Sequence, residues 1–186
     1  MALTPGEMHA AILANLEAKS GHPLPYWLDR LREADDSDAK ARRDHLKSLG
    51  LGHFQAQAVA RAASGEADPY ADPEALVNAL FPATLRPGYD AFAKTCLGLG
   101  DDVAARPCQT YVPFYARTQF AIIKPGTDGT LEVGLALPAD FTHAELAPAT
   151  GLGGSERITH RTSLPPDGSL TTGQRTVLAE AYTRNR

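Results

Sequence analysis

Residues 120–137 read FAIIKPGTDGTLEVGLAL, and this stretch decides the fold of the C-terminal part of the chain. Residues 120–123 are apolar on both faces of an extended chain, which is typical of a covered strand. Residues 125–129, PGTDG, have the composition of a turn. Over 131–137, Leu and Val then alternate with polar or small residues. Because successive side chains of a strand point to opposite faces, the stretch predicts an antiparallel hairpin with one buried face.

The flanking segments extend this sheet and add helices to it. Residues 109–115 and 158–164 are also predicted strands, and Pro113 favours an edge position for the first of them, because proline cannot donate to a ladder. Helical spacing of apolar residues predicts helices over about 73–80, 87–96 and 171–181. Helices combined with an antiparallel sheet predict an α+β sandwich, built around one shared core.

Upstream of this region, residues 1–64 show helical periodicity throughout. Met8, Ile12 and Leu16 recur every four residues, as the apolar stripe of a helix does. Three further helices are predicted, over about 24–31, up to residue 49, and over 53–63. Residues 65–73 are rich in Gly, Pro and acidic residues and predict a linker. The organisation expected is therefore a helical module over 1–64, a linker over 65–73 and an α+β module over 74–186.

Composition excludes several classes of protein. Of the 186 residues, 43% are hydrophobic and 22% are charged, as in an ordered globular chain. The net charge is −4, whereas a protein that binds nucleic acid through its overall charge is normally basic. Any anion site must therefore rest on a local cluster. No apolar run of about 18 residues and no leader segment stands out, so we expect a cytoplasmic protein with two free thiols.

Two parts of the chain resemble known bacterial families. Residues 17–28, EAKSGHPLPYWL, followed by residues 50–53, GLGH, resemble the family catalogued as domain of unknown function 4287. From about Leu76 onward the chain resembles family 5655. The stretches that carry this second resemblance are Leu85-Arg86-Pro87, Tyr111, Gln119-Phe120-Ala121 with Ile123, Val133-Gly134-Leu135 and Thr159-His160-Arg161. The resemblance implies two modules and a cytosolic bacterial origin, and it transfers no activity, because both families are named for lacking one.

The segment 46–56, LKSLGLGHFQA, is the first candidate site. Two glycines between predicted helices, with a small residue four positions after the second, resemble a helix–hairpin–helix, in which backbone N–H groups face a nucleic-acid phosphate. The candidate contact residues are Gly50, Gly52, His53, Lys47, Arg43 and Arg61. The alternative is a plain helical hairpin, with Gly50 as the C-cap and Leu51 in the core.

The predicted sheet carries the second candidate site. Gly134 and Ala136 are small residues on one face of their strand, and Arg157, Thr159 and Arg161 share a face of another. If these strands are neighbours, a shallow groove rimmed by guanidinium groups would bind a carboxylate or phosphate. Its expected walls are Arg117, Lys124, Tyr111 and Tyr115. In the alternative, helices cover one face and solvent the other, and the arginines are ordinary surface residues.

Signatures of catalysis are missing from the sequence. There is no GxSxG, Walker loop or HExxH, and the six histidines lack metal-ligand spacing. We therefore expect no catalytic residues, no metal and no cofactor. The function predicted first is a non-enzymatic accessory protein that contacts a nucleic-acid backbone through the glycine turn. The second is a module that binds a small anion on the arginine-bearing sheet face, and the third is an interaction protein that uses its helices alone.

Overall fold

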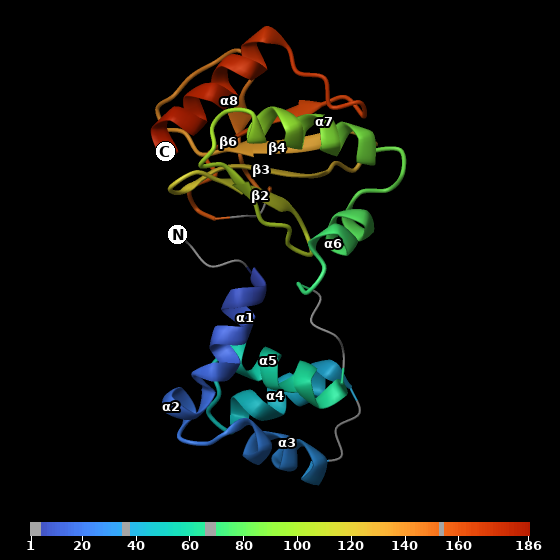
Figure 1. Ribbon diagram of the computed structural model, residues 1–186, viewed down its shortest axis with the longest axis vertical. Coiled ribbons are helices and arrows are strands. Elements are labelled where there is room, and N and C mark those ends of the chain that lie inside the picture. The colour runs from blue at the N-terminus through green and yellow to red at the C-terminus, as the bar shows by residue number, and fades with distance from the viewer. Residues whose placement is uncertain (1–4, 35–37, 66–69, 153–154) are drawn as a thin grey trace. The chain divides into compact units, whose positions relative to one another are not determined.

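The computed structural model describes residues 5–34, 38–65, 70–152 and 155–186. They divide into two compact units, one ending at Ala71 and the other formed by Asp72–Arg186 (Figure 1). The linker predicted over 65–73 includes residues 66–69, which lie outside the described residues. Its last residue, Pro73, already belongs to a helix.

The N-terminal unit is helical. Its elements are α1 (Pro5–Ala14), α2 (Leu16–Ser20), α3 (Leu24–Glu33), α4 (Ala39–Ser48) and α5 (His53–Ser64). The first predicted helix divides at Asn15, whose φ of −96° and ψ of 7° leave the helical region. Apolar residues from α2 to α5 form the core, with Trp27 among them. The Trp27 indole N–H lies 3.1 Å from the Ser20 hydroxyl and 3.1 Å from the His22 carbonyl, so its polar atom is satisfied inside the unit.

The C-terminal unit is an α+β fold, as the sequence predicts. Its helices are α6 (Pro73–Leu80), α7 (Arg86–Leu97) and α8 (Thr172–Asn185). Its strands are β1 (Ala104–Ala105), β2 (Val112–Tyr115), β3 (Gln119–Pro125), β4 (Leu131–Leu135), β5 (Ala147–Pro148) and β6 (His160–Leu164). They form one antiparallel sheet in the order β1-β2-β3-β4-β6-β5. The predicted hairpin over 120–137 is confirmed as β3 and β4.

One face of this sheet is covered by two helices. Buried residues of α7 and α8 share a core with Ala121, Ile123, Val133 and Leu135, which lie on the same face because Ala121 pairs with Leu135 and Ile123 with Val133 (Figure 1). A smaller cluster covers part of the other face, where Ile122 pairs with Gly134. The helices therefore leave the second face to loops and solvent, and any sheet-based site has to form there or at the ends of the strands.

Two local predictions about the sheet unit have different outcomes. Thr171 and Gln174 form the expected capping box at α8, with the Thr171 hydroxyl accepting from the Gln174 N–H at 3.0 Å and the Gln174 side chain accepting from the Thr171 N–H at 3.1 Å. The edge position predicted from Pro113 is wrong, because β1 pairs with the outer side of β2. The ladder between β1 and β2 pairs Ala104 with Tyr115 and Ala105 with Phe114. It ends before Pro113, so the missing N–H of the proline interrupts neither pair.

In the described parts of the chain, no helix has the length and apolar character needed to cross a membrane.

Candidate functional sites

The turn between α4 and α5 is a Schellman motif. The Gly50 N–H donates to the Lys47 carbonyl at 3.0 Å, and the Leu51 N–H donates to the Leu46 carbonyl at 3.1 Å. Gly50 has a φ of +101°, a left-handed conformation that an L side chain rarely adopts. Leu51 is 4% exposed and packs into the helical core. Gly50 therefore takes the left-handed position directly after the C-cap Leu49, as a plain helical hairpin requires, which explains this glycine without any ligand.

The start of α5 leaves backbone donors open to solvent. Gly52 is the N-cap, and its own N–H donates to the Gln55 side-chain oxygen at 2.9 Å. Among the described residues, none accepts a hydrogen bond from the N–H groups of His53, Phe54 and Gln55. Ala56 is fully buried, so a small residue here lets the two helices pack closely. The turn thus presents three backbone N–H groups at the positive end of a 12-residue helix.

The structure separates the basic residues that the sequence placed at this turn. Lys47 lies in the last turn of α4, with its ammonium 3.6 Å from the Asp44 carboxylate, and His53 is exposed at the first position of α5. Arg43 lies one turn earlier on α4 and is half-buried. Arg61 lies in the last turn of α5, roughly 12 Å along the helix axis from His53. Of these four residues, His53 therefore carries one of the open N–H groups, and Lys47 lies in the helix turn that leads into the Gly50–Gly52 connection.

Exposed apolar side chains surround the turn, and the sequence analysis did not select them. Phe54 is 69% exposed and Leu49 is 43% exposed. The Phe54 ring lies edge-on to the His53 ring, with 5.3 Å between the ring centroids. A signal was present in the sequence, because Phe54 lies on the side of α5 opposite Ala56, Val59 and Ala60, which enter the helical core; on the Phe54 side, only Ala58 is buried.

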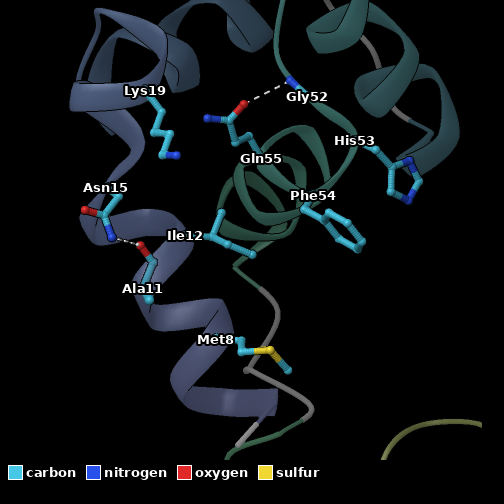
Figure 2. Close-up of a pocket in the computed structure, with 9 residues that line it drawn as sticks. All are labelled: Met8, Ala11, Ile12, Asn15, Lys19, Gly52, His53, Phe54 and Gln55. Atoms are coloured by element: carbon cyan, nitrogen blue, oxygen red, sulfur yellow. Dashed lines mark hydrogen bonds between the residues drawn. The ribbon is translucent and has the colours of Figure 1, made fainter. Parts of the chain in front are cut away.

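A pocket of about 500 Å³ opens beside this turn (Figure 2). One wall comes from α1, the Asn15 junction and α2, and the other from the N-cap and first turn of α5. The lining residues are Met8, Ala11, Ile12, Asn15, Lys19, Gly52, His53, Phe54 and Gln55. Four of the nine, Met8, Ala11, Ile12 and Phe54, have apolar side chains, and two of these, Met8 and Phe54, are large and at least 48% exposed.

The single groove expected on the sheet does not form. β4 and β6 are neighbours, and Gly134 pairs with Arg161 as that idea requires. However, a Cβ on Gly134 would lie 2.5 Å from Ile158 and 2.6 Å from Leu152, so apolar side chains already cover the predicted floor. Arg157 lies in a turn before β6 and does not share the strand with Arg161. The prediction that Arg157 and Arg161 share a strand face required regular alternation from Arg157 onward, and the turn at Arg157 breaks that alternation.

The arginines instead line two separate pockets. Arg157 and Thr159 lie with Ala136 and Arg184 in a pocket of about 480 Å³ near the end of α8. Arg161 lies in another pocket, of about 330 Å³, where its guanidinium is 4.0 Å from the Glu132 carboxylate. Within the described residues Arg157 has no hydrogen-bond or ion-pair partner, whereas the Arg184 Nε donates to Glu180 at 2.7 Å.

The expected walls of the groove are also dispersed. Arg117 is exposed in the turn between β2 and β3, and Lys124 lies opposite Glu132 across the β3–β4 ladder. Tyr111 packs against the small cluster on the second sheet face. Tyr115 lies under the Arg106 guanidinium, 4.8 Å from the ring centroid, and partial burial raises its pKa.

Cys96, Cys108 and His160 are wholly or partly buried side chains that could carry chemistry. Burial raises the pKa of the Cys96 and Cys108 thiols, the opposite of what an activated nucleophile needs. His160 is buried, with one ring nitrogen 2.8 Å from the Phe141 carbonyl and the other 2.9 Å from the Thr159 hydroxyl. Within the ranges that the structure describes, no three His, Cys, Asp or Glu side chains gather as a metal site.

Comparison with known proteins identifies the family of the C-terminal unit. Residues 74–185 match the model of the family described as Domain of unknown function (DUF5655), and the chain belongs to this family. No curated protein matches the chain. No solved structure matches it either. Function therefore has to be inferred from the residues and geometry above.

Proposed function

We propose that this chain is a non-enzymatic accessory protein whose α4–α5 turn binds the phosphate backbone of a nucleic acid. The observation that carries the proposal is the group of open N–H donors of His53, Phe54 and Gln55, at the N-terminus of α5 and near Lys47. Backbone donors at a helix N-terminus favour phosphate through both hydrogen bonding and the helix dipole. Because no carboxylate accepts from these donors, a phosphate would meet no internal competitor among the described residues.

We also propose a bacterial origin and a cytoplasmic location for the protein. Residues 17–28 and 50–53 resemble family 4287, and the second of these stretches contains the turn itself. We assign the protein to the bacterial cytoplasm on this resemblance. Its two cysteines are free thiols, as is usual in a reducing compartment.

Two substitutions at His53, the first residue of α5, distinguish the contribution of its backbone N–H to binding from that of its side chain. Proline is well tolerated at this position, and Gly52 has the extended ψ of 160° that a following proline requires. His53→Pro removes one open N–H together with the imidazole, whereas His53→Ala removes only the imidazole. We expect His53→Pro to bind a labelled oligonucleotide about tenfold more weakly than His53→Ala, as the loss of a charge-assisted hydrogen bond predicts.

Fluorescence anisotropy at low and moderate salt measures this difference on a labelled duplex and a labelled single strand. Lys47→Ala should lower the salt slope by about one, because one phosphate contact is lost. Lys40→Ala is the matched control, since Lys40 is also exposed on α4 and also pairs with Asp44, but at the opposite end of the helix from the turn. The absence of saturable binding at low salt would refute the proposal.

A second function rests on the pocket that contains Arg157. Arg157 and Arg184 both line this pocket of about 480 Å³, and Arg157 has no competing partner among the described residues. We propose a small anion such as a phosphate or carboxylate as its ligand, because arginine binds both in bidentate geometry. Glu180 already occupies one donor of Arg184, which makes this site the weaker of the two.

Thermal unfolding in phosphate, sulfate and small dicarboxylates tests the second function. A bound anion raises the melting temperature by an amount that grows with the logarithm of the ratio of its concentration to its Kd. Arg157→Ala should abolish the shift. Arg161→Ala should leave the shift unchanged, since Arg161 lines the other pocket and faces Glu132. Equal effects of the two substitutions would rule out the Arg157 pocket as the site.

A further inference from the structure

The pocket between α1 and α5 has two chemically different ends (Figure 2). Met8, Ile12 and Phe54 form an apolar part, and Lys19 and Gln55 form a polar part. The two polar residues come from different helices, α2 and α5. Figure 2 shows the Lys19 ammonium and the Gln55 amide pointing toward one another above Ile12.

The polar end offers donors and no competing carboxylate. The Lys19 ammonium has no ion-pair or hydrogen-bond partner among the described residues, whereas the Lys19 backbone N–H donates to the Asn15 carbonyl at 3.1 Å. The Gln55 side-chain oxygen already accepts from the Gly52 N–H at 2.9 Å, so the amide nitrogen of Gln55 is the atom left for a ligand. The Asn15 amide nitrogen donates to the Ala11 carbonyl at 2.8 Å within its own helix. An ammonium and an amide N–H, both donors, select a negatively charged oxygen.

The apolar end leaves hydrophobic surface in water. Met8 is 48% exposed and Phe54 is 69% exposed, and they stand on opposite walls of the pocket. A chain of methylene groups or an aromatic ring between them would remove apolar surface of both from water. The volume of about 500 Å³ is within the range of small-molecule sites.

We propose that this pocket binds a small amphipathic carboxylate, such as a medium-chain fatty acid or an arylalkanoic acid. Its carboxylate would lie between Lys19 and the Gln55 amide, and its apolar tail would lie between Met8 and Phe54. The positive charge of Lys19 at one end and the apolar walls at the other select the two halves of this ligand. Met8 and Lys19 belong to this pocket and not to the phosphate contact proposed for the turn, so each proposal can fail without the other.

Binding of hexanoate, octanoate and decanoate to the full chain, below their micelle concentrations, is the test. The chain has two methionines, Met1 and Met8, so the ¹³C-methyl signal of Met8 is readily assigned with a Met8→Leu variant. We expect the acids to shift the Met8 signal saturably, and affinity to rise by up to about fourfold for each added CH₂. Octanol, which has the same tail and no charge, should bind several-fold more weakly than octanoate.

Lys19→Met removes the charge and keeps an apolar stem. It should weaken octanoate several-fold and leave octanol unchanged, whereas Lys40→Met, an exposed control on α4, should change neither. Phe54→Ala should weaken the acid and the alcohol alike. The proposal is overturned if octanoate and octanol bind equally, if Lys19→Met has no effect on octanoate, or if no acid shifts the Met8 signal.

Discussion

Gly88 is the position where one added methyl group should damage the C-terminal unit most clearly. It is the third residue of α7 and is buried, where the helix crosses the turn before α8. A Cβ at Gly88 would lie 2.2 Å from the Pro166 carbonyl oxygen, 2.7 Å from a Leu131 methyl and 2.8 Å from the Gly168 nitrogen. Gly168 approaches just as closely, since a Cβ there would lie 2.2 Å from the Gly88 carbonyl oxygen. Two glycines therefore let two backbones touch.

The size of the effect follows from two opposing terms. Alanine in place of glycine inside a helix gains about 1 kcal/mol of helix propensity. Against this, the methyl group lies roughly 1 Å inside the ordinary contact distance of 3.4 Å. Overpacking costs about 1–3 kcal/mol, and the upper end applies because two of the three neighbours are backbone atoms that no rotamer change can move. We therefore expect Gly88→Ala to lower the free energy of unfolding by about 2 kcal/mol.

Circular dichroism during thermal and urea unfolding measures this loss. For a unit of this size, about 2 kcal/mol corresponds to a melting temperature lower by roughly 6–10 °C. Gly98→Ala is the control at the other end of α7, where the nearest atom to the new Cβ is the Lys94 carbonyl at 3.3 Å and the site is exposed. It should stay within about 0.5 kcal/mol of the parent chain. An unchanged or raised melting temperature for Gly88→Ala would refute the close-approach reasoning.

Two further predictions concern ionisable groups. Iodoacetamide should label Cys108 before Cys96 in the folded chain, because Cys96 has no exposed surface; equal labelling rates in peptide mass spectrometry would contradict this. Both reactions should be slow at pH 7 and faster at pH 9, since burial raises the pKa of both thiols. Burial raises the pKa of Tyr89 to about 12, whereas the same hydroxyl ionises at about its ordinary pKa of 10.0 in the unfolded chain, so the free energy of unfolding falls as the pH rises from 10 toward 12. Urea titrations at several pH values should show a less steep fall for Tyr89→Phe. An identical dependence of the free energy of unfolding on pH would show that Tyr89 does not contribute.

Much of the local structure of both units could be predicted from the sequence, because it depends on neighbours along the chain. Strict alternation over 131–137 placed β4, and the PGTDG turn joined it to β3. The spacing of Thr171 and Gln174 placed the start of α8. The two glycines of the α4–α5 turn also indicated a tight connection, since a left-handed residue such as Gly50 is a local requirement.

The candidate sites depend on contacts between distant segments, and these only the tertiary structure decided. Alternation assigns Gly134 to a face, but it does not show that Leu152 and Ile158 return to cover that face. It also could not show that Arg157 lies in a turn before the strand and lines one pocket with Arg184 from α8.

The pocket beside the turn has the same origin. Lys19 and Gln55 are 36 positions apart in the sequence and line one pocket because α2 and α5 belong to one helical core. Phe54 stays exposed because its neighbours Leu51 and Ala56 are the residues that turn inward. Periodicity along the sequence indicates which side of a helix or strand is apolar. The packing of helices and strands decides which other residues that side contacts, and a binding site is formed by such contacts between distant segments.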